Sequence, residues 1–347
     1  MSGALFFAYP GKLDLNTGGY AYDRRVIRGL DKLGWDVRPL SLGDGFPFPT
    51  DDTRHSAEEA LSALADGDLV MLDGLAFGVL GDWAEREAER LRLVALVHHP
   101  LALETGLDEA QREMFHGCEV QALSHARHVI VTSPMTAREL SSHYGVQQDR
   151  ITVAIPGTDP ASASIGDRSI PHIISIGTLT PRKGHDILLA ALKQVEDLDW
   201  TATIVGSRAL NAQTTVELDR QLEELGLGER VTLPGECDDP RELLANADIF
   251  ALASRYEGFG MVFAEALSHG LPIVACSAGA IPDVVPEDAG ILVPVDDVSA
   301  FAAGLRRLLS DPDERQARAK ASRLAGAKLP GWDETASIIS STLEIKA

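Results

Sequence analysis

The feature that most constrains the fold is a regular alternation of short apolar runs with amphipathic helical stretches. In the first half of the chain, we expect strands at Ala4–Tyr9, Asp36–Leu40, Asp68–Leu72, Leu93–His98, His128–Thr132 and Ile151–Ile155. Helical patterns lie between them, among them Tyr20–Leu33, Glu109–Ala126 and Thr136–Tyr144. Strands that alternate with helices predict a parallel sheet covered by helices on both faces.

This alternation stops after residue 155 and begins again near residue 171. The intervening Pro156-Gly-Thr-Asp-Pro160 and the small polar residues up to Ser169 are typical of a linker. The second half repeats the pattern, with strands expected at Pro171–Ile176, Thr201–Val205, Arg230–Leu233, Ile249–Ala253, Ile273–Cys276 and Ile291–Val293. Helices are expected there at Asp186–Val195, Thr214–Leu225, Arg241–Ala245, Gly260–Ser268, Val298–Leu309 and Asp313–Ala325.

The pattern therefore predicts an α/β protein of two doubly wound, Rossmann-like domains that face each other across a cleft. We place the first domain at residues 1–157 and the second at 158–330. A last helix, at about residues 331–347, is expected to pack back on the first domain. Ligands of open α/β sheets bind outside the carboxyl ends of the strands, so loops that directly follow strands are the places to search for a site.

Composition excludes several classes of function. Acidic residues outnumber basic ones by 52 to 31, a formal charge of −21, which argues against nucleic acid as a partner and against a broad polybasic membrane anchor. The three cysteines, Cys118, Cys237 and Cys276, are far apart and favour neither a disulfide framework nor structural zinc. The opening residues lack a basic n-region, and no apolar run approaches the roughly 20 residues of a membrane span. We therefore expect a cytoplasmic protein, with peripheral membrane contact and oligomeric state left open.

The most informative motif contains two glutamates, Glu257 and Glu265, separated by seven residues. A Gly-Phe-Gly turn follows Glu257, and Glu265 lies within a run patterned as a buried helix. If that helix begins near Phe259, its first N–H groups and its dipole favour a phosphate. Glu265 then lies about 8–9 Å further along the helix axis. Surface carboxylates stabilised by a helix dipole are the alternative, but a carboxylate among apolar neighbours normally needs hydrogen-bond donors, which ligand hydroxyls can supply.

A pair of cations follows the first strand of the second domain. Arg182 and Lys183 stand in Gly177-Thr-Leu-Thr-Pro-Arg-Lys-Gly184, directly before a helical stretch. The fork of an arginine and the point charge of a lysine can hold a diphosphate and offset the charge of a leaving group. The alternative is a solvated basic pair on a loop.

Two further candidates follow strands of the first domain. Gly18-Gly19 opens a helix and can allow the backbone to approach a phosphate or a sugar, although a tight turn explains the glycines equally well. His98 ends the fourth strand, where an imidazole can contact a substrate hydroxyl or act as an acid or base. A partly buried histidine bonded to backbone is the alternative. A metal site is disfavoured because no carboxylate–histidine cluster is visible near it in the sequence.

These residues together resemble the retaining glycosyltransferases of family 4, which have the two-domain GT-B fold. The resemblance rests on Gly18-Gly19, His98, the Pro156-Gly-Thr-Asp segment, Arg182-Lys183-Gly184 and the stretch from Ser254 to Gly270. The last of these carries most weight, because the two glutamates are embedded in Glu-Gly-Phe-Gly-Met-Val-Phe-Ala-Glu-Ala. The activity implied is transfer of a hexosyl group from a nucleoside-diphosphate sugar to an acceptor hydroxyl of a saccharide or lipid.

The resemblance also implies roles for the motif residues. Glu257, with the backbone groups of Phe259, Gly260 and Met261, is expected to hold the hydroxyls of the donor sugar. Glu265 is expected to bind the ribose hydroxyls. These interactions place the nucleotide sugar along the start of one helix.

The remaining roles concern the phosphates and the transferred sugar. Arg182 and Lys183 are expected to bind the diphosphate, and Gly18 and Gly19 to lie near the phosphate and the acceptor. His98 is expected to contact the transferred sugar from the first domain. His98, Glu257, Arg182 and Lys183 are thus the predicted catalytic residues.

The resemblance implies no cofactor and no metal, with a UDP- or GDP-linked sugar as the donor substrate. One departure is Thr178, at a position where many members of the family carry arginine. No residue is a convincing covalent nucleophile, so front-side attack is expected, with the departing phosphate taking the acceptor proton.

Other functions remain open at this point. A phosphorylase or a nucleotide-sugar epimerase of the same fold is one alternative, and a catalytically inactive sugar-nucleotide-binding protein is another. NAD-dependent oxidoreduction is opposed by the absence of a Gly-x-Gly-x-x-Gly sequence after the first strand.

Overall fold

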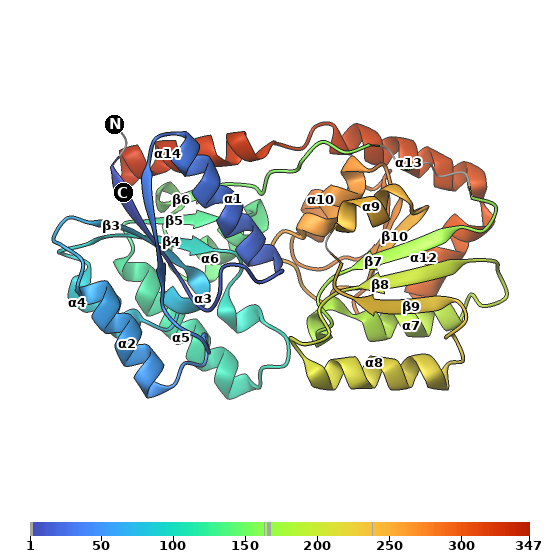
Figure 1. Cartoon of the computed structure of the whole chain (residues 1–347), viewed down its shortest axis with the longest axis horizontal. Helices are drawn as coiled ribbons and strands as arrows, with labels where there is room; N and C mark the ends of the chain where they lie inside the picture. Colours follow the sequence, from blue (N-terminus) through green and yellow to red (C-terminus); the bar gives the residue numbers. More distant parts are fainter. Residues whose placement is uncertain (1–2, 163, 165–167, 238) are drawn as a thin grey trace. The chain divides into compact units, whose positions relative to one another are not determined.

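The computed structural model describes residues 3–162, 164, 168–237 and 239–347. The first two residues and part of the expected linker therefore lie outside the described residues. The chain divides into two compact units, an N-terminal unit of Met1–Gly157 and Pro330–Ala347 and a C-terminal unit of Thr158–Leu329 (Figure 1).

The N-terminal unit is built on a parallel sheet in the order β2-β1-β3-β4-β5-β6. Its strands are β1 (Ala4–Tyr9), β2 (Asp36–Ser41), β3 (Leu69–Asp73), β4 (Arg92–Val97), β5 (His128–Val131) and β6 (Ile151–Val153). The chain adds β2 on one side of β1 and all later strands on the other side. The order therefore reverses between β1 and β3, where the loops leave the sheet in opposite directions and a ligand crevice is expected.

The C-terminal unit has a second parallel sheet, in the order β12-β11-β10-β7-β8-β9. Its strands are β7 (His172–Ile176), β8 (Thr201–Val205), β9 (Val231–Gly235), β10 (Ile249–Leu252), β11 (Ile273–Cys276) and β12 (Gly290–Val293). Read from β9, this is the Rossmann order, and the reversal lies between β7 and β10.

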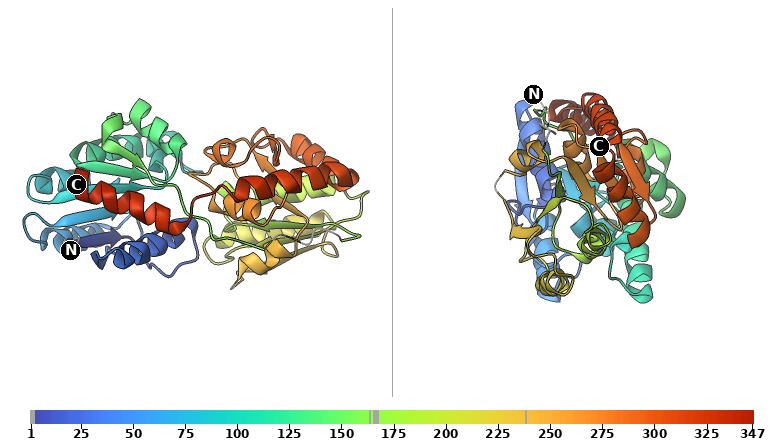
Figure 2. Two further views of the ribbon diagram at one scale, coloured as in Figure 1. Left: turned by 90° about the horizontal axis from the view of Figure 1, so that it is seen from above. Right: turned by 90° about the vertical axis from the view of Figure 1, so that its right-hand side faces the viewer.

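Helices cover both faces of each sheet (Figure 2). The N-terminal unit contains α1 (Gly18–Lys32), α2 (Asp51–Ser62), α3 (Gly74–Phe77), α4 (Gly81–Glu87), α5 (Glu109–His125), α6 (Pro134–His143) and α14 (Trp332–Lys346). The C-terminal unit contains α7 (His185–Lys193), α8 (Ala212–Glu224), α9 (Pro240–Ala245), α10 (Met261–Ser268), α11 (Ile281–Val284), α12 (Val298–Ser310) and α13 (Pro312–Gly326). Three 3₁₀ turns complete the described elements: η1 (Leu101–Leu103), η2 (Gln148–Arg150) and η3 (Pro181–Lys183).

The cores are the central strands and the helices that cover them. Strands β3, β5, β10 and β11 are buried over their whole length, as expected for parallel strands between two helical layers. Trp83 and Trp200, at 0% and 1% exposure, are the largest fully buried side chains, one in each unit.

The last helix, α14, packs against α1 although 299 residues separate them in the chain (Figure 1). Trp35 Nε1 donates a hydrogen bond to Ser340 Oγ at 2.9 Å. The two helices approach closely at Gly29, where an added β-carbon would lie 2.5 Å from the Ala336 β-carbon. At the start of α14, the backbone of Trp332 touches Gly157, so a β-carbon at Gly157 would lie 2.3 Å from Trp332 N.

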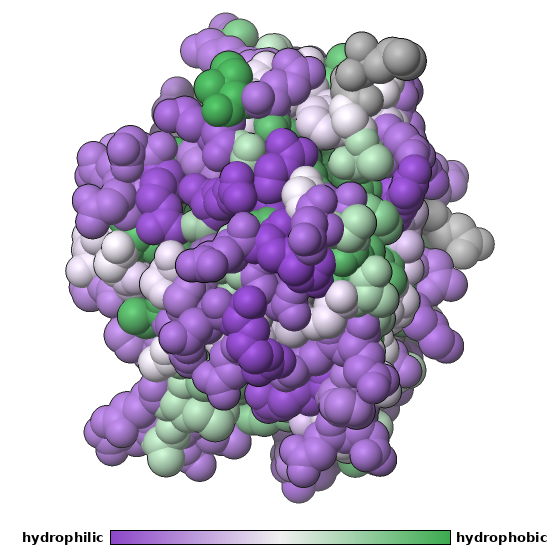
Figure 3. Space-filling model, turned by 90° about the vertical axis from the view of Figure 1, so that its left-hand side faces the viewer, coloured by the Kyte–Doolittle hydropathy of each residue, from purple (hydrophilic) through white to green (hydrophobic). Residues whose placement is uncertain are grey.

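Within the part of the chain that the structure describes, no helix is both long enough and apolar enough to span a membrane. Hydrophilic residues dominate the face drawn in Figure 3, and hydrophobic residues occur there in small separate groups.

Candidate active site

The C-terminal unit brings the predicted cations and the first glutamate into direct contact. Arg182 and Lys183 lie in η3 after β7, and Glu257 lies in the loop after β10. Lys183 Nζ is 2.6 Å from Glu257 Oε1, and Arg182 Nη1 is 3.3 Å from Glu257 Oε2. The sheet reverses its order between β7 and β10, so this cluster lies at the carboxyl edge where a Rossmann-like sheet binds its ligand.

Glu257 is buried, with 5% of its surface exposed, and is ionised because of its neighbours. Burial alone would raise the pKa of its carboxyl, but the charges of Lys183 and Arg182 outweigh burial and lower the pKa to about 2. Ser254 Oγ donates a further hydrogen bond to Glu257 Oε1 at 2.7 Å. The cluster thus places two cations and a buried, ionised carboxylate side by side.

Glycines hold the backbone of this cluster at close range. Gly279 has a φ of +54°, and a β-carbon there would lie 2.2 Å from the carbonyl oxygen of Glu257. The next residue, Ala280, donates its N–H to that same oxygen at 2.9 Å. Gly184 has a φ of +64°, and its β-carbon would lie 2.0 Å from the carbonyl oxygen of Ala253. Larger side chains at both glycines would push the loop that carries Glu257 out of place.

Arg255 joins the two loops of the cluster. Its N–H donates to the carbonyl of Arg182 at 2.7 Å. Its guanidinium donates to both carboxylate oxygens of Asp186 on α7, at 3.1 and 2.7 Å, and to Asp296 at 2.7 Å. Arg255 therefore fixes the backbone that precedes Glu257 against the turn that carries the cations.

Helix α10 begins immediately beyond the cluster. Gly260 caps it in the left-handed region, with a φ of +86°, and Phe263 anchors its buried side against Phe250, with ring centroids 5.4 Å apart. The helix begins at Met261, so Phe259 lies in the preceding turn rather than at a helix start. The first N–H groups of α10 have no partner within the helix. Glu265 lies one turn into the helix and is half-buried.

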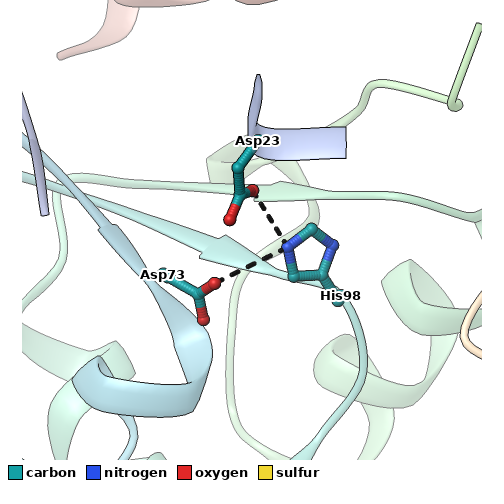
Figure 4. Close-up of side chains that lie close together, drawn as sticks. All are labelled: Asp23, Asp73 and His98. Atoms are coloured by element: carbon teal, nitrogen blue, oxygen red, sulfur yellow. Dashed lines mark hydrogen bonds and ion pairs between the residues drawn. The ribbon is translucent and has the colours of Figure 1, made fainter. Parts of the chain in front are cut away.

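The N-terminal unit contains a second cluster, formed by Asp23, Asp73 and His98 (Figure 4). Asp23 comes from α1, Asp73 from the end of β3, and His98 from the residue after β4. His98 Nε2 lies 3.2 Å from Asp23 Oδ1 and 3.8 Å from Asp73 Oδ2. This cluster also lies at a point of strand reversal, between β1 and β3.

Burial and mutual charge control the protonation of this cluster. Burial, followed by the charge of Asp23, raises the pKa of Asp73 to about 7. For His98, burial acts to lower the pKa, but the neighbouring Asp23 and Asp73 outweigh it and raise the pKa above its ordinary value. The edge of the Tyr22 ring contacts His98, with centroids 5.3 Å apart, and Tyr22 in turn contacts Trp332 at 5.8 Å.

One atom of each of these three side chains can serve as a metal ligand, and these atoms lie within 4.8 Å of one another. The sequence argument that no carboxylates accompany His98 is therefore wrong. The carboxylates come from two elements distant in sequence, one a helix, and they meet the histidine only when the sheet assembles. The arrangement can bind a cation, share a proton or orient the imidazole.

The loop and helix start that precede this cluster contain Gly18 and Gly19. Neither glycine has a positive φ, so a tight turn does not account for them. A β-carbon at Gly19 would lie 3.5 Å from the His98 ring, and one at Gly18 would meet no described atom within 4 Å. Gly19 thus lies beside His98, and Gly18 borders open space at the N-terminus of α1. Thr17 caps this helix by accepting a hydrogen bond from Tyr20 N at 3.5 Å.

Glu119 on α5 holds the turn that follows His98 in place. Glu119 Oε2 accepts the N–H of Leu101 at 2.8 Å, at the start of η1. Glu119 is buried, with 2% of its surface exposed, and burial raises the pKa of its carboxyl to about 8. His99 points to Glu104, with Nε2 and Oε2 3.2 Å apart.

Comparison with known proteins identifies the family. The model of Glycosyltransferase Family 4 matches residues 22–162, and that of Glycosyl transferases group 1 matches residues 167–325. The D-inositol 3-phosphate glycosyltransferase of Corynebacterium glutamicum is 30% identical over 75% of this chain and 68% of that protein. The enzyme of the same name from Corynebacterium efficiens is 30% identical over 75% of this chain and 67% of that protein. The chain belongs to glycosyltransferase family 4.

Solved structures show the same architecture. Sucrose-phosphate synthase from Thermosynechococcus elongatus superposes with a TM-score of 0.84, at 22% identity, over 99% of this chain and 98% of that one. HepE of Anabaena superposes with a TM-score of 0.80, at 21% identity, over 99% of this chain and 100% of that one. The predicted two-domain α/β GT-B fold is confirmed. The protein is a glycosyltransferase.

The predicted site residues of this family 4 glycosyltransferase fall into two groups, one in each unit. Arg182 and Lys183 contact Glu257, and Gly19 lies beside His98. Sequence reasoning did not include Asp23, Asp73 or Arg255. A signal for Asp73 was present, since a carboxylate directly after a buried strand occupies the position where α/β enzymes bind ligands. Asp23 had no such signal, because it lies within a helix next to arginines.

Proposed function

We propose that this glycosyltransferase moves a hexosyl group from a nucleoside-diphosphate sugar to an acceptor hydroxyl, with retention of anomeric configuration and without a metal ion. The observation that carries the proposal is the cluster of Arg182, Lys183 and the buried Glu257 at the strand reversal of the C-terminal unit. Its cations suit a diphosphate, and its carboxylate suits sugar hydroxyls.

Each group in the cluster has a distinct role in this proposal. Arg182 and Lys183 bind the diphosphate and stabilise the charge that develops on it as the glycosidic bond breaks. Glu257 accepts hydrogen bonds from the donor sugar, assisted by the backbone of Phe259, Gly260 and Met261. Because two cations and the start of α10 supply the positive charge, the reaction needs no metal for that purpose.

The nucleoside binds along α10, where Glu265 accepts hydrogen bonds from the ribose hydroxyls. The solved structure of HepE contains UDP-glucose, which makes UDP-glucose the first donor to examine. GDP-linked sugars remain the second class of donor to test. Gly18, Gly19 and His98 belong to the N-terminal unit, where they contact the phosphate, the acceptor and the transferred sugar.

The reaction proceeds by front-side attack. The bond between the anomeric carbon and the phosphate oxygen breaks, and the acceptor oxygen bonds to the same face of that carbon. The acceptor proton passes to the departing phosphate oxygen, so no enzyme carboxylate forms a covalent intermediate.

We propose a saccharide or a small polyol as the acceptor. The relatives named D-inositol 3-phosphate glycosyltransferase support a polyol. A lipid is the second class of acceptor to test.

The first experiment measures thermal stabilisation of the purified protein by a panel of UDP-, GDP- and ADP-linked sugars. The donor selected is then incubated with candidate acceptors, with and without EDTA, and the anomeric configuration of the product is read by NMR. Transfer with retention that persists in EDTA supports the proposal. Inversion of configuration, a requirement for metal, or release of sugar 1-phosphate without an acceptor product would each contradict it.

The variant that tests the phosphate site is Arg182→Ala. It should lose stabilisation by the donor, measured relative to the melting temperature of the free variant, because Arg182 also contacts Glu257. A variant that transfers sugar as well as the wild type would exclude Arg182 from the phosphate site.

A further inference from the structure

The imidazole of His98 is held on its inner edge by two carboxylates from different elements. Nε2 faces Asp23 and Asp73, at 3.2 and 3.8 Å, whereas Nδ1 lies on the side of the ring away from both carboxylates (Figure 4). The side chain of His98 is 21% exposed, and that of Asp23 is fully buried. The carboxylates therefore lie deeper in the protein than the ring, at its Nε2 edge, and the ring is the more exposed part of the cluster.

Asp23 contains an unsatisfied oxygen. Its Oδ2 is buried and has no hydrogen-bond partner among the described residues. Asp73 Oδ1 accepts the N–H of Leu75 at 2.7 Å, which fixes the direction of the second carboxyl. A buried carboxylate normally needs a donor, and two buried carboxylates at this range cannot both be ionised without strong repulsion. Burial and the charge of Asp23 accordingly raise the pKa of Asp73.

The structure assigns Asp23 and Asp73 as positioning residues for His98. Asp23 accepts the Nε2 hydrogen, and Asp73, held in place by the N–H of Leu75, lies near the same nitrogen, so that the imidazole keeps one orientation and directs Nδ1 away from the carboxylates. This inference rests on the proposed function, in which His98 contacts the transferred sugar.

The carboxylates restrict the imidazole of His98 to one tautomer and one ring orientation. A neutral imidazole has two tautomers and can turn over about its bond to the β-carbon, which exchanges its nitrogen and carbon edges. A carboxylate that accepts from one nitrogen selects one tautomer and one orientation, and it favours the cation. Both nitrogens of the cation donate, so Nδ1 becomes a donor directed at a sugar oxygen.

Among the described residues, two carboxylates and one aromatic ring influence the imidazole of His98. Asp23 on α1 and Asp73 at the end of β3 supply the charges, and Tyr22 on α1 contributes the edge of its ring. The Tyr20 phenol nearby also experiences the charges of Asp73 and Asp23, and burial and these charges raise its pKa above the ordinary value. It therefore stays neutral and adds no charge to the site.

The test is a histidine titration by NMR on the full chain with ¹⁵N-labelled histidine, with His98→Gln used to identify the signal. In the wild type, we expect the Nε2–H tautomer and a pKa above the ordinary value of about 6.5. Asp23→Asn should lower the pKa of His98, because it removes the neighbouring charge that raises it. It should also shift the acidic limb of the pH profile of transfer in the same direction. Asp73→Asn, which keeps a neutral hydrogen-bonding group, should preserve the tautomer.

The matched control is Asp31→Asn, an exposed change on the same helix, which should leave the His98 signal and the melting temperature at their wild-type values. An Nδ1–H tautomer in the wild type would overturn the inference even if Asp23→Asn failed to fold. An unchanged pKa in a folded Asp23→Asn protein would overturn it as well. So would stoichiometric binding of Mg²⁺, Mn²⁺ or Zn²⁺ that displaces the His98 signals, because the cluster would then be a metal site. The titration needs no donor, so its outcome is independent of whether sugar transfer is observed.

Discussion

Lys183 Nζ lies 2.6 Å from Glu257 Oε1, and both side chains are nearly buried, at 12% and 6% exposure. Lys183 thus forms an ion pair with the carboxylate that precedes α10, and Arg182 contacts the other oxygen of that carboxylate. The two cations therefore have a structural role in addition to the proposed catalytic one. Variants of this cluster have to be assessed for stability and for turnover separately.

We expect Lys183→Met to destabilise the protein by about 1–3 kcal/mol, less than the roughly 3–5 kcal/mol seen when a buried charge loses its whole partner, because Arg182 remains. Glu257→Gln combined with Lys183→Met should recover part of this loss, with a coupling energy of about 1–3 kcal/mol. Urea denaturation of the wild type, both single variants and the double variant measures this coupling. Additive effects would show that the pair contributes nothing to stability. We expect the double variant to have no sugar transfer, because it lacks both the lysine and the carboxylate of the proposed donor site.

Gly279→Ala should destabilise the protein and reduce transfer, because its β-carbon would meet the carbonyl oxygen of Glu257 at 2.2 Å. The expected loss is about 2–4 kcal/mol, the sum of backbone strain at positive φ and overpacking. Gly226→Ala is the matched control, since Gly226 has a φ of +68° and no described atom within 4 Å of the added carbon. It isolates the strain alone, at about 1–2 kcal/mol. Equal losses in the two variants would mean that the contact at Glu257 relaxes without effect.

Glu265→Ala should weaken binding of the nucleoside diphosphate by roughly 10–100-fold, the effect of losing hydrogen bonds to a charged group. The protein should fold normally, because Glu265 is half-buried and has solvent on one side. Isothermal titration calorimetry with UDP and GDP measures the affinity. Glu223→Ala, on the exposed side of α8, serves as the control. An unchanged affinity would remove Glu265 from the ribose site.

Glu119→Gln should make folding less sensitive to alkaline pH. Burial raises the pKa of Glu119 from 4.5 to about 8 in the folded protein, so the folded state binds the extra proton between these values. Its contribution to stability is complete below pH 4.5 and is lost as the pH rises through 8. Glutamine keeps an acceptor for Leu101 N without the charge, and we expect a gain of roughly 1–4 kcal/mol at pH 9. Denaturation at pH 5, 7 and 9 measures this gain, and Glu113→Gln, exposed on the same helix, should show no such trend.

The central strands were predictable because they are short runs of largely apolar residues that are buried over their whole length. The expected bounds of β1, β8 and β11 match the structure residue for residue. The expected Asp68–Leu72 is observed as Leu69–Asp73, because strand ends depend on pairing with neighbours that the sequence does not show. Helix α2 was not predicted. It buries only Ala57 and Leu61, so it lacks the apolar stripe that marks a helix.

The candidate site was predictable where its residues cluster in the sequence and not where the fold assembles them. Arg182, Lys183 and Glu257 occur in motifs and follow strands, so local reading identified them. Asp23 lies on a helix between Tyr22 and Arg24, a setting in which a carboxylate is normally solvated. Its burial arises from the passage of α1 over the carboxyl edge of β3 and β4, which depends on strand order.

The chain passes between its two units at Gly157 and again near Pro330, and the backbones of the two passages touch where Gly157 meets Trp332. Trp332 then rests against Tyr22, whose other side supports the ring of His98. The first residue of the C-terminal helix is thus joined to the imidazole of His98 by two successive ring contacts within the N-terminal unit. The end of the chain therefore helps to support a side chain that lies near its beginning.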